Sequence, residues 1–369
     1  MRCPKYSGEK RLANMHKTPT EFGGADFKVL LSAIRKLSDF ALIYEDDLEP
    51  LHVKGLVHAH VRINGTGAVL RIPRYSAAGL SPDLNISYQA CCFRRASASG
   101  HTPLLVDTLD PCEGLPWGAL IVTEIFGSVP LLPASLPAIG KALAAIHALE
   151  VPTRTDRLPI PSYEDPLTNA LENIEGQAGY LKKAGIASRS LVQLEEELTR
   201  AREFVDKKRK KNVPVALVGT DTHPGNFMIR PDGTAIFVDL EKTAYGMPAI
   251  DLAHASVYTS TMWDPDIATE LTDDEVREFY RHYFLELPDA LRAAWRPWCE
   301  PLRRFTWLRT MTWCAKWQVE SLEGANWSVA NNDPAYIKKV RRRIEGYFDA
   351  DTIERVRSGF NSTMDIGRD

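Results

Sequence analysis

The chain has 369 residues, of which 44% are hydrophobic and 25% are charged, a balance typical of a globular protein large enough for two lobes. Its formal net charge of -3 gives no long-range attraction to nucleic acid or to an anionic membrane, so we expect neither partner. The six cysteines form no Cys-x-x-Cys pair, and no apolar stretch resembles a signal peptide or a membrane span, so we expect a soluble cytoplasmic protein.

The beginning of the chain predicts a polar tail, a helix and a hairpin. Residues 1–25 read as the tail, and apolar residues at helical spacing then predict a helix over residues 26–40. Within residues 51–73, polar and apolar residues alternate before a turn at Asn64-Gly65, and a mostly apolar segment that carries Arg71 follows the turn. This alternation and the turn residues predict a β-hairpin.

Two further elements complete a small lobe, which we place at residues 26–126. Residues 84–98 have the spacing of a helix, and residues 119–123 form a short apolar run suited to a buried strand. The rest of the chain, residues 127–369, is expected to form a larger lobe that is mostly helical. Its predicted helices lie at 136–149, twice within 162–206, at 305–322 and after a capping box at Thr272, with a strand, a loop and a hairpin within 213–239.

A run of basic residues at 207–211 has two interpretations. Five consecutive cations could bind nucleic acid. Positive charge at the C-terminal end of a helix is also favourable by itself, because it complements the helix dipole. We favour the second interpretation, since nothing else in the composition points to nucleic acid.

A short polar segment near residue 220 carries the most informative chemical pattern. Asp221 precedes Asn226 by five positions, and Asp239 follows at the far end of a predicted hairpin. Transfer of a phosphoryl group from a nucleotide needs a carboxylate that orients the acceptor hydroxyl, and oxygen ligands that hold Mg²⁺ on the phosphates. One loop and the end of the next hairpin can supply both. We therefore predict Asp221 as the catalytic base and Asn226 and Asp239 as Mg²⁺ ligands.

The same segment resembles the signature of the aminoglycoside phosphotransferase and choline kinase superfamily. It reads Asp221-Thr222-His223-Pro224-Gly225-Asn226, then Asp239-Leu240-Glu241, then Asp251-Leu252-Ala253. The resemblance implies an α+β, bilobal protein-kinase-like fold, with a small β-rich N-terminal lobe and a large, mostly helical C-terminal lobe. It also implies ATP or GTP and Mg²⁺ as cofactors, and it implies that His223 and Asp251 support the catalytic loop.

Weaker similarity extends upstream to the nucleotide-binding lobe. The predicted hairpin resembles the strands that cover the nucleotide, with Gly55 in the phosphate-covering loop and Arg71 on the strand whose basic residue contacts the phosphates. The stretch after the strand at 119–123 resembles the hinge against which adenine packs. The resemblance therefore implies that the backbone at Glu124 and Phe126 contacts the base.

The sequence departs from the family pattern at three positions. Gly219 stands where the family has a His two residues before the catalytic Asp, and Thr220 replaces the usual Gly, so the loop must be braced differently. Gln89 stands where the helix at 84–98 would supply a Glu to pair with Arg71. The family's ion pair would then become a charge-assisted hydrogen bond.

The resemblance implies a small molecule with a hydroxyl group as acceptor and leaves its charge open. The acidic stretch at 262–290 would attract a cation, whereas aromatic faces hold quaternary ammonium groups or sugars, and arginines favour an anion. Solvated helix faces explain the charges more simply, and core packing explains the tryptophans more simply. The candidate tryptophans are Trp307, Trp313 and Trp317, and the arginines are Arg292, Arg296, Arg303, Arg304 and Arg309.

Two other classes of function stay open at this point. A kinase that acts on a protein, or an enzyme that transfers a nucleotidyl group, could use similar metal ligands. A nucleotide-binding protein without turnover is the non-enzymatic alternative, although it would not need Asp221. The sequence gives no indication of the oligomeric state.

Overall fold

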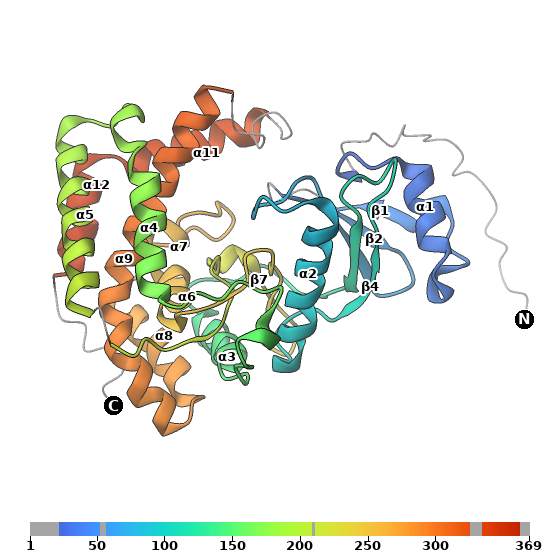
Figure 1. The fold of residues 1–369 in the computed structure, drawn as a ribbon, viewed down its shortest axis with the longest axis horizontal. Coiled ribbons are helices and arrows are strands. Elements are labelled where there is room, and N and C mark those ends of the chain that lie inside the picture. The colour runs from blue at the N-terminus through green and yellow to red at the C-terminus, as the bar shows by residue number, and fades with distance from the viewer. Residues whose placement is uncertain (1–21, 52–56, 209–210, 325–333, 362–369) are drawn as a thin grey trace, which may run out of the picture.

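The structure, a computed structural model of the chain, describes residues 22–51, 57–208, 211–324 and 334–361. Figure 1 shows a small lobe built around a sheet and a larger lobe made mostly of helices. This is the α+β, bilobal architecture that the sequence predicts. No helix in the described ranges is both long and apolar enough to span a membrane.

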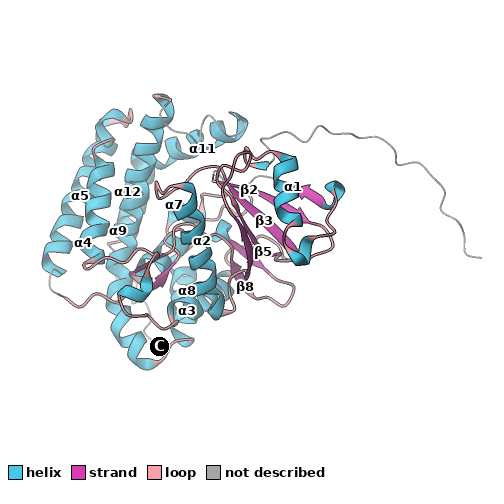
Figure 2. Cartoon of the chain, turned by 45° about the vertical axis from the view of Figure 1, so that its right-hand side comes forward, coloured by secondary structure: helices cyan, strands magenta, loops and turns pink. Residues whose placement is uncertain are grey.

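The small lobe is a five-stranded antiparallel sheet with one helix on each side (Figure 2). The strand order is β1-β2-β3-β5-β4, and the predicted hairpin is β2 and β3. The short strands β1 and β4 were not predicted, and the other expected elements of this lobe are confirmed. The strands are β1 (Leu48–Pro50), β2 (His58–Ile63), β3 (Ala68–Pro73), β4 (Leu105–Leu109) and β5 (Ala119–Thr123), and the helices are α1 (Phe27–Arg35) and α2 (Pro82–Ala96).

Alternation along the strands decides which side chains reach the space between the lobes. Ala59, Val61 and Ile63 on β2 belong to the core beneath α1. Because successive side chains of a strand point to opposite faces, His58 and His60 lie on the other face. His60 is paired in register with Arg71 on β3, so strand periodicity also turns Arg71 toward the large lobe.

The large lobe is a helical assembly that carries two small β-ribbons. The strand, loop and hairpin predicted within 213–239 are confirmed as β6, a loop and the pair β7–β8, while β9, which pairs with β6, was not predicted. The ribbon strands are β6 (Ala216–Val218), β7 (Phe227–Ile229), β8 (Ala235–Phe237) and β9 (Ala244–Gly246). The helices are α3 (Leu136–His147), α4 (Pro166–Ala178), α5 (Ser188–Lys208), α6 (Pro248–Ser256), α7 (Tyr258–Thr261), α8 (Asp273–Leu285), α9 (Asp289–Leu322), α11 (Pro334–Tyr347) and α12 (Ala350–Gly359).

Two details of the helices bear on the sequence predictions. The capping box that opens α8 is formed as predicted, with the Thr272 side chain accepting from the backbone of Glu275 and the Glu275 side chain accepting in return. The helix predicted at 305–322 is the C-terminal part of the longer α9, which continues through Pro297 and Pro301. Each proline removes one backbone hydrogen bond without ending the helix.

The hinge between the lobes is fixed to the ribbon that follows the catalytic loop. Ser128 and Ile229 exchange two backbone hydrogen bonds of 2.9 and 2.8 Å. Between hinge and ribbon, Gly127 has no room for a side chain, since an added Cβ would lie 2.5 Å from the Ile229 carbonyl oxygen. The predicted hinge therefore lies directly beside strand β7.

Candidate active site

The loop that carries Asp221 connects β6 to β7 and is held by a buried carboxylate. Asp251, at the start of α6, is completely buried and accepts hydrogen bonds from the backbone N–H groups of Gly219 at 2.6 Å and Thr220 at 2.8 Å. His147 on α3 lies 3.1 Å from the same carboxylate through Nε2. Charge-assisted bonds of this kind are about twice as strong as neutral ones. The backbone of the two residues that precede Asp221 in the sequence is thus anchored.

The departures of the sequence at Gly219 and Thr220 have a structural reason. A Cβ at Gly219 would lie 2.6 Å from the ring of Phe237 and 2.9 Å from Thr222, so the ring fills the space that a histidine side chain would need. Thr220 has a positive φ of 59°, which costs free energy for a residue with a Cβ. Its side chain donates to the Lys242 carbonyl at 2.7 Å, and its carbonyl accepts from Arg309 at 3.0 Å.

Asp221 lies beside two basic side chains. The Lys242 ammonium is 2.5 Å from Asp221 Oδ2, and His254 Nδ1 is 3.7 Å from Oδ1. Burial alone would raise the pKa of Asp221, but the charge of Lys242 and the nearby His223 and His254 hold that pKa well below its usual range. Asp221 is therefore ionised at neutral pH, in the state that can accept a proton from a hydroxyl.

The two predicted metal ligands lie on adjoining backbone segments, since the Val238 N–H donates to the Asn226 carbonyl at 2.9 Å. The Asn226 side chain donates through Nδ2 to the Asp221 carbonyl at 2.8 Å, a bond that leaves its amide oxygen uninvolved. Asp239 is partly exposed and uses Oδ1 to accept from Arg71. Nearby, Glu241 is buried, and its Oε2 has no hydrogen-bond partner among the described residues. Burial, assisted by the charge of Asp239, raises the pKa of Glu241 to about 8. A buried carboxylate oxygen without a hydrogen-bond partner and the side-chain oxygens of Asn226 and Asp239 are ligand types that suit a divalent cation.

Arg71 makes different contacts from those predicted. Its guanidinium donates to the Val238 carbonyl at 2.9 Å and to Asp239 at 2.8 Å, and it lies over the ring of Phe93. The hydrogen bond to Gln89 that the family alignment would imply is not found among the described residues, and a carboxylate is a stronger partner for a guanidinium than a neutral amide. Gln89 instead lies 3.1 Å from His58 Nε2 through its side-chain oxygen.

The structure gives partial information on the predicted nucleotide contacts. The Glu124 side chain accepts from Arg62 at 2.6 Å, and its backbone N–H donates to the Gly67 carbonyl at 2.7 Å, so of its two backbone groups the carbonyl is the one left for a base. Phe126 follows at the hinge with 66% of its surface exposed. Gly55 lies outside the described residues.

His223 contributes to the catalytic loop through its backbone. Its carbonyl accepts from the Asn226 N–H at 2.9 Å, while its ring Nδ1 is buried and has no hydrogen-bond partner in the described part of the chain. The ring packs edge-on against that of His254, with 6.3 Å between the ring centres. Burial lowers the pKa of His223, although Asp221 opposes that shift.

The predicted acceptor tryptophans fall into two groups. Trp307 and Trp317 are almost completely buried, and the ring of Trp307 packs against Phe360. They lie in the core, as the simpler interpretation of the sequence proposed. Trp313 is half-buried and meets Trp263 edge-on at 5.7 Å, and Trp263 in turn lies under the guanidinium of Arg343.

The charged stretches around the acceptor region are mostly paired within the protein. The acidic residues 270–289 form ion pairs that include Asp274 with Arg277, Glu278 with Arg281 and Glu286 with Lys141. Asp264 is different, because its Oδ2 would lie 3.0 Å from a Cβ on Gly225 of the catalytic loop. All five candidate arginines are also engaged, namely Arg292 with Asp289, Arg296 over Phe284, Arg303 with Ser256, Arg304 with Glu197 and Arg309 with Thr220.

Sequence reasoning missed three residues that the structure brings to the site. Lys242 directly follows the Asp239-Leu240-Glu241 motif, and His254 lies one helical turn after Asp251, so both had a positional signal. His58 was seen only as a polar member of an alternating strand. Its contact with Glu241, 3.4 Å between Nδ1 and Oε2, joins segments that are far apart in the sequence.

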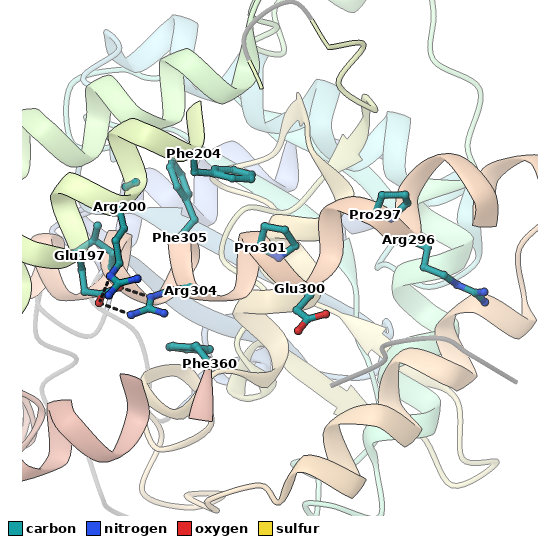
Figure 3. Close-up of a pocket in the computed structure, with 12 residues that line it drawn as sticks. Glu197, Arg200, Phe204, Arg296, Pro297, Glu300, Pro301, Arg304, Phe305 and Phe360 are labelled. Atoms are coloured by element: carbon teal, nitrogen blue, oxygen red, sulfur yellow. Dashed lines mark hydrogen bonds and ion pairs between the residues drawn. The ribbon is translucent and has the colours of Figure 1, made fainter. Parts of the chain in front are cut away.

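A cavity of about 550 Å³ lies away from these residues, between α5 and α9. Figure 3 shows the aromatic rings of Phe204, Phe305 and Phe360 around it, with the ion pair of Glu197 and Arg304 at one side. No residue of the catalytic loop lines it. The cavity is therefore separate from the candidate active site.

Comparison with known proteins supports the chemistry suggested by this geometry. A model of the phosphotransferase enzyme family matches residues 57–298 of the chain. The match includes the segments that carry Asp221, Asn226 and Asp239. A search of curated proteins found no significant match.

Several solved structures share the fold at low sequence identity. A choline/ethanolamine kinase family protein from Mesorhizobium loti is 16% identical, with a TM-score of 0.55, and the match covers 90% of this chain and 98% of that chain. The GDP complex of aminoglycoside 2'-phosphotransferase-IIIa is 15% identical, with a TM-score of 0.58 and coverage of 88% and 99%. Choline kinase LicA from Streptococcus pneumoniae is 14% identical, with a TM-score of 0.55 and coverage of 91% and 99%.

Proposed function

Since this chain belongs to the phosphotransferase enzyme family, we propose that it transfers the γ-phosphoryl group of ATP or GTP to a hydroxyl group of a small molecule. The reaction would form a bond between the acceptor oxygen and the γ-phosphorus and break the bond to the β–γ bridging oxygen. The products are the phosphorylated acceptor and a nucleoside diphosphate. GDP is the nucleotide in the complex of the similar aminoglycoside phosphotransferase.

The observation that carries the proposal is the position of Asp221 beside Lys242. The Lys242 ammonium lies 2.5 Å from Asp221 and 4.0 Å from Glu241, so it connects the proposed base with the turn that carries Asp239. Phosphoryl transfer places negative charge on the oxygens of the γ-phosphoryl group, and a fixed cation beside the base stabilises that charge. We therefore add Lys242 to the proposed catalytic residues.

The acceptor hydroxyl would be oriented by Asp221. An ionised carboxylate accepts the hydroxyl hydrogen bond in the ground state and takes the proton as the new oxygen–phosphorus bond forms. Asp251 keeps the loop backbone in place during this step, since it holds both residues before Asp221. Positioning of this kind supplies a large share of the rate enhancement in phosphoryl transfer.

The donor nucleotide would lie between the hinge and this loop. Arg71, buried and pointing out of β3, is proposed to contact the phosphates, and the backbone near Glu124 and Phe126 is proposed to contact the base. Asn226 and Asp239 would hold Mg²⁺, which when bound neutralises charge on the phosphates. Arg71 already binds Asp239, so it also restrains the metal-binding carboxylate.

A direct assay tests the proposal. Consumption of ATP and of GTP is measured with Mg²⁺ and a panel of acceptors: aminoglycosides, choline and ethanolamine, amino sugars, sugar acids and hydroxy amino acids. We expect one class to stimulate turnover and the D221N variant to lose about 10³-fold in kcat, a loss typical for a general base. Nucleotide affinity, measured by calorimetry, should stay nearly unchanged in that variant.

Two results would contradict the proposal. Full activity of D221N would exclude Asp221 as the base. Nucleotide binding without turnover for every acceptor, including a peptide library, would favour a nucleotide-binding protein without catalytic activity. Turnover with peptides alone would favour a protein kinase.

A further inference from the structure

Three side chains between the lobes bring potential metal ligands together. His58 on β2, with Asp239 and Glu241 after β8, place one ligand atom each within 4.8 Å of one another. His58 and Glu241 are 4% and 5% exposed. The cluster is therefore a built site between two lobes and differs from an exposed patch of acidic residues.

The hydrogen bond of His58 decides which of its ring nitrogens is available. Its Nε2 lies 3.1 Å from the side-chain oxygen of Gln89, which can only accept, so Nε2 carries the hydrogen. In the neutral ring Nδ1 then has a free lone pair. A second residue that fixes the tautomer in this way is the usual companion of a metal-binding histidine.

That nitrogen lies near a carboxylate oxygen that has no hydrogen-bond donor in the described part of the chain. Glu241 Oε2 lies 3.4 Å from His58 Nδ1 and has no hydrogen-bond partner among the residues described. Two acceptors in a buried site repel each other unless a cation or a proton lies between them. The buried Glu241 oxygen without a partner is the second observation, independent of the clustering, and a bound ion would satisfy it in place of a proton.

We propose that His58, Asp239 and Glu241 bind a divalent first-row transition metal ion such as Mn²⁺ or Zn²⁺ in preference to Mg²⁺. Imidazole nitrogen is a good ligand for transition metals, whereas Mg²⁺ prefers an all-oxygen shell and releases its water reluctantly. The site shares Asp239 with the proposed Mg²⁺ pair but takes its other ligands from different residues. Because His58 belongs to the small lobe, the ion ties the two lobes together.

Arg71 and Lys242 leave one oxygen of each of the two carboxylates for a cation. Three positive side chains, Arg71, Lys242 and Arg74, act on the cluster that contains Asp239 and Glu241. Arg71 uses Oδ1 of Asp239 and leaves Oδ2, and Lys242 is 4.0 Å from Oε1 of Glu241, away from Oε2. We therefore assign Asp239 Oδ2 and Glu241 Oε2 to the proposed site, together with His58 Nδ1.

Binding is tested on the full-length protein without nucleotide, so that phosphoryl transfer does not enter the measurement. Mn²⁺ is titrated and followed by electron paramagnetic resonance, with pulsed detection of ¹⁴N coupling from a bound imidazole. We expect one ion with ¹⁴N coupling, displaced by an equal concentration of Zn²⁺ but not of Mg²⁺. H58A should lose the coupling and weaken binding at least about 10-fold.

His60 provides a matched control, since it lies on the same strand with its ring 6.1 Å from that of His58. H60A should keep the ¹⁴N coupling and the affinity. If H58A does not fold, E241Q tests the same site and should also weaken Mn²⁺ binding about 10-fold or more. Circular dichroism identifies variants that are folded.

Three outcomes would overturn the proposal. Mn²⁺ binding without ¹⁴N coupling would place the ion on oxygen ligands alone. Displacement by an equal concentration of Mg²⁺ would remove the transition-metal preference. Absence of Mn²⁺ binding to the nucleotide-free protein would mean that a proton between Glu241 and His58 satisfies the site.

Discussion

The catalytic loop in the large lobe and the pair of His58 and Gln89 in the small lobe are held in different ways. The loop is anchored by one completely buried carboxylate, Asp251, which takes two backbone hydrogen bonds and contacts His147. In the small lobe, α2 contributes the neutral side chain of Gln89, which forms a hydrogen bond with the buried His58. Arg71 there lies over the ring of Phe93 on α2 and takes its charged partner, Asp239, from the large lobe.

The difference shows where the family pattern can change. A buried charge that satisfies several backbone groups has no good substitute, because each group left unpaired costs free energy. A single pair of side chains can be exchanged for another pair that satisfies the same atoms. Here His58 and Gln89 pair with each other, and the ion-pair partner of Arg71 comes from the metal-binding turn.

The largest effect on stability is expected when the anchor of the loop is removed. D251A leaves the buried N–H of Gly219 and the partly buried N–H of Thr220 without an acceptor, and because each such group costs about 1–3 kcal/mol, we expect a loss of about 3–5 kcal/mol in unfolding free energy. Urea denaturation followed by circular dichroism measures it. D251N keeps one acceptor oxygen and serves as the matched control, with a smaller loss. A loss below about 1 kcal/mol for D251A would show that other contacts hold the loop.

The histidine beside Asp221 makes the loop region sensitive to acid. Burial lowers the pKa of His254 to about 3, against the opposing charge of Asp221. The unfolded chain takes up this proton below about pH 6.5, whereas the folded protein does not, so stability falls as the pH decreases from 6.5. By pH 5 this single group costs about 2 kcal/mol.

The H254Q variant separates this effect from other acid-sensitive groups. We expect its stability, relative to wild type, to improve by about 2 kcal/mol between pH 7.5 and pH 5. Urea denaturation at both pH values gives the difference. Parallel losses in the two proteins would show that His254 is protonated in the folded state as easily as in the unfolded state.

The smallest loss of unfolding free energy is expected for a substitution in the small lobe. Q89L removes one hydrogen bond between neutral groups and leaves His58 Nε2 without an acceptor, so we expect a loss of about 1 kcal/mol. The same denaturation experiment measures it beside D251A. If D251A and Q89L lost equal amounts of unfolding free energy, the proposed difference between the charged anchor Asp251 and the exchangeable pair of His58 and Gln89 would be wrong.

The sequence predicted the elements and the loop because their signals are local. The strand at 119–123 and the alternation of β2 follow from neighbouring residues, and Asp221, Asn226 and Asp239 lie within one short segment. The strands β1 and β4 were missed because they lie at the edges of the sheet, where one side of a strand is less constrained.

The rest of the site depends on contacts between distant segments. Nothing near Gly219 in the sequence indicates that the ring of Phe237 fills its place. The partner of Gln89 could not be predicted either, because it depends on which face of β2 meets α2. Arg309 was seen as a charge on a helix, and its bond to Thr220 appears only when α9 is packed.

The bond between Arg309 and Thr220 also affects how the protein is made. These residues are 89 positions apart, so the catalytic loop leaves the ribosome long before the side chain that braces it. Domains begin to fold as they emerge during synthesis, and contacts between distant residues form late. A nascent chain that ends before α9 therefore has Asp251 beside the loop but lacks the Arg309 brace, and its catalytic loop is completed only when that late helix docks.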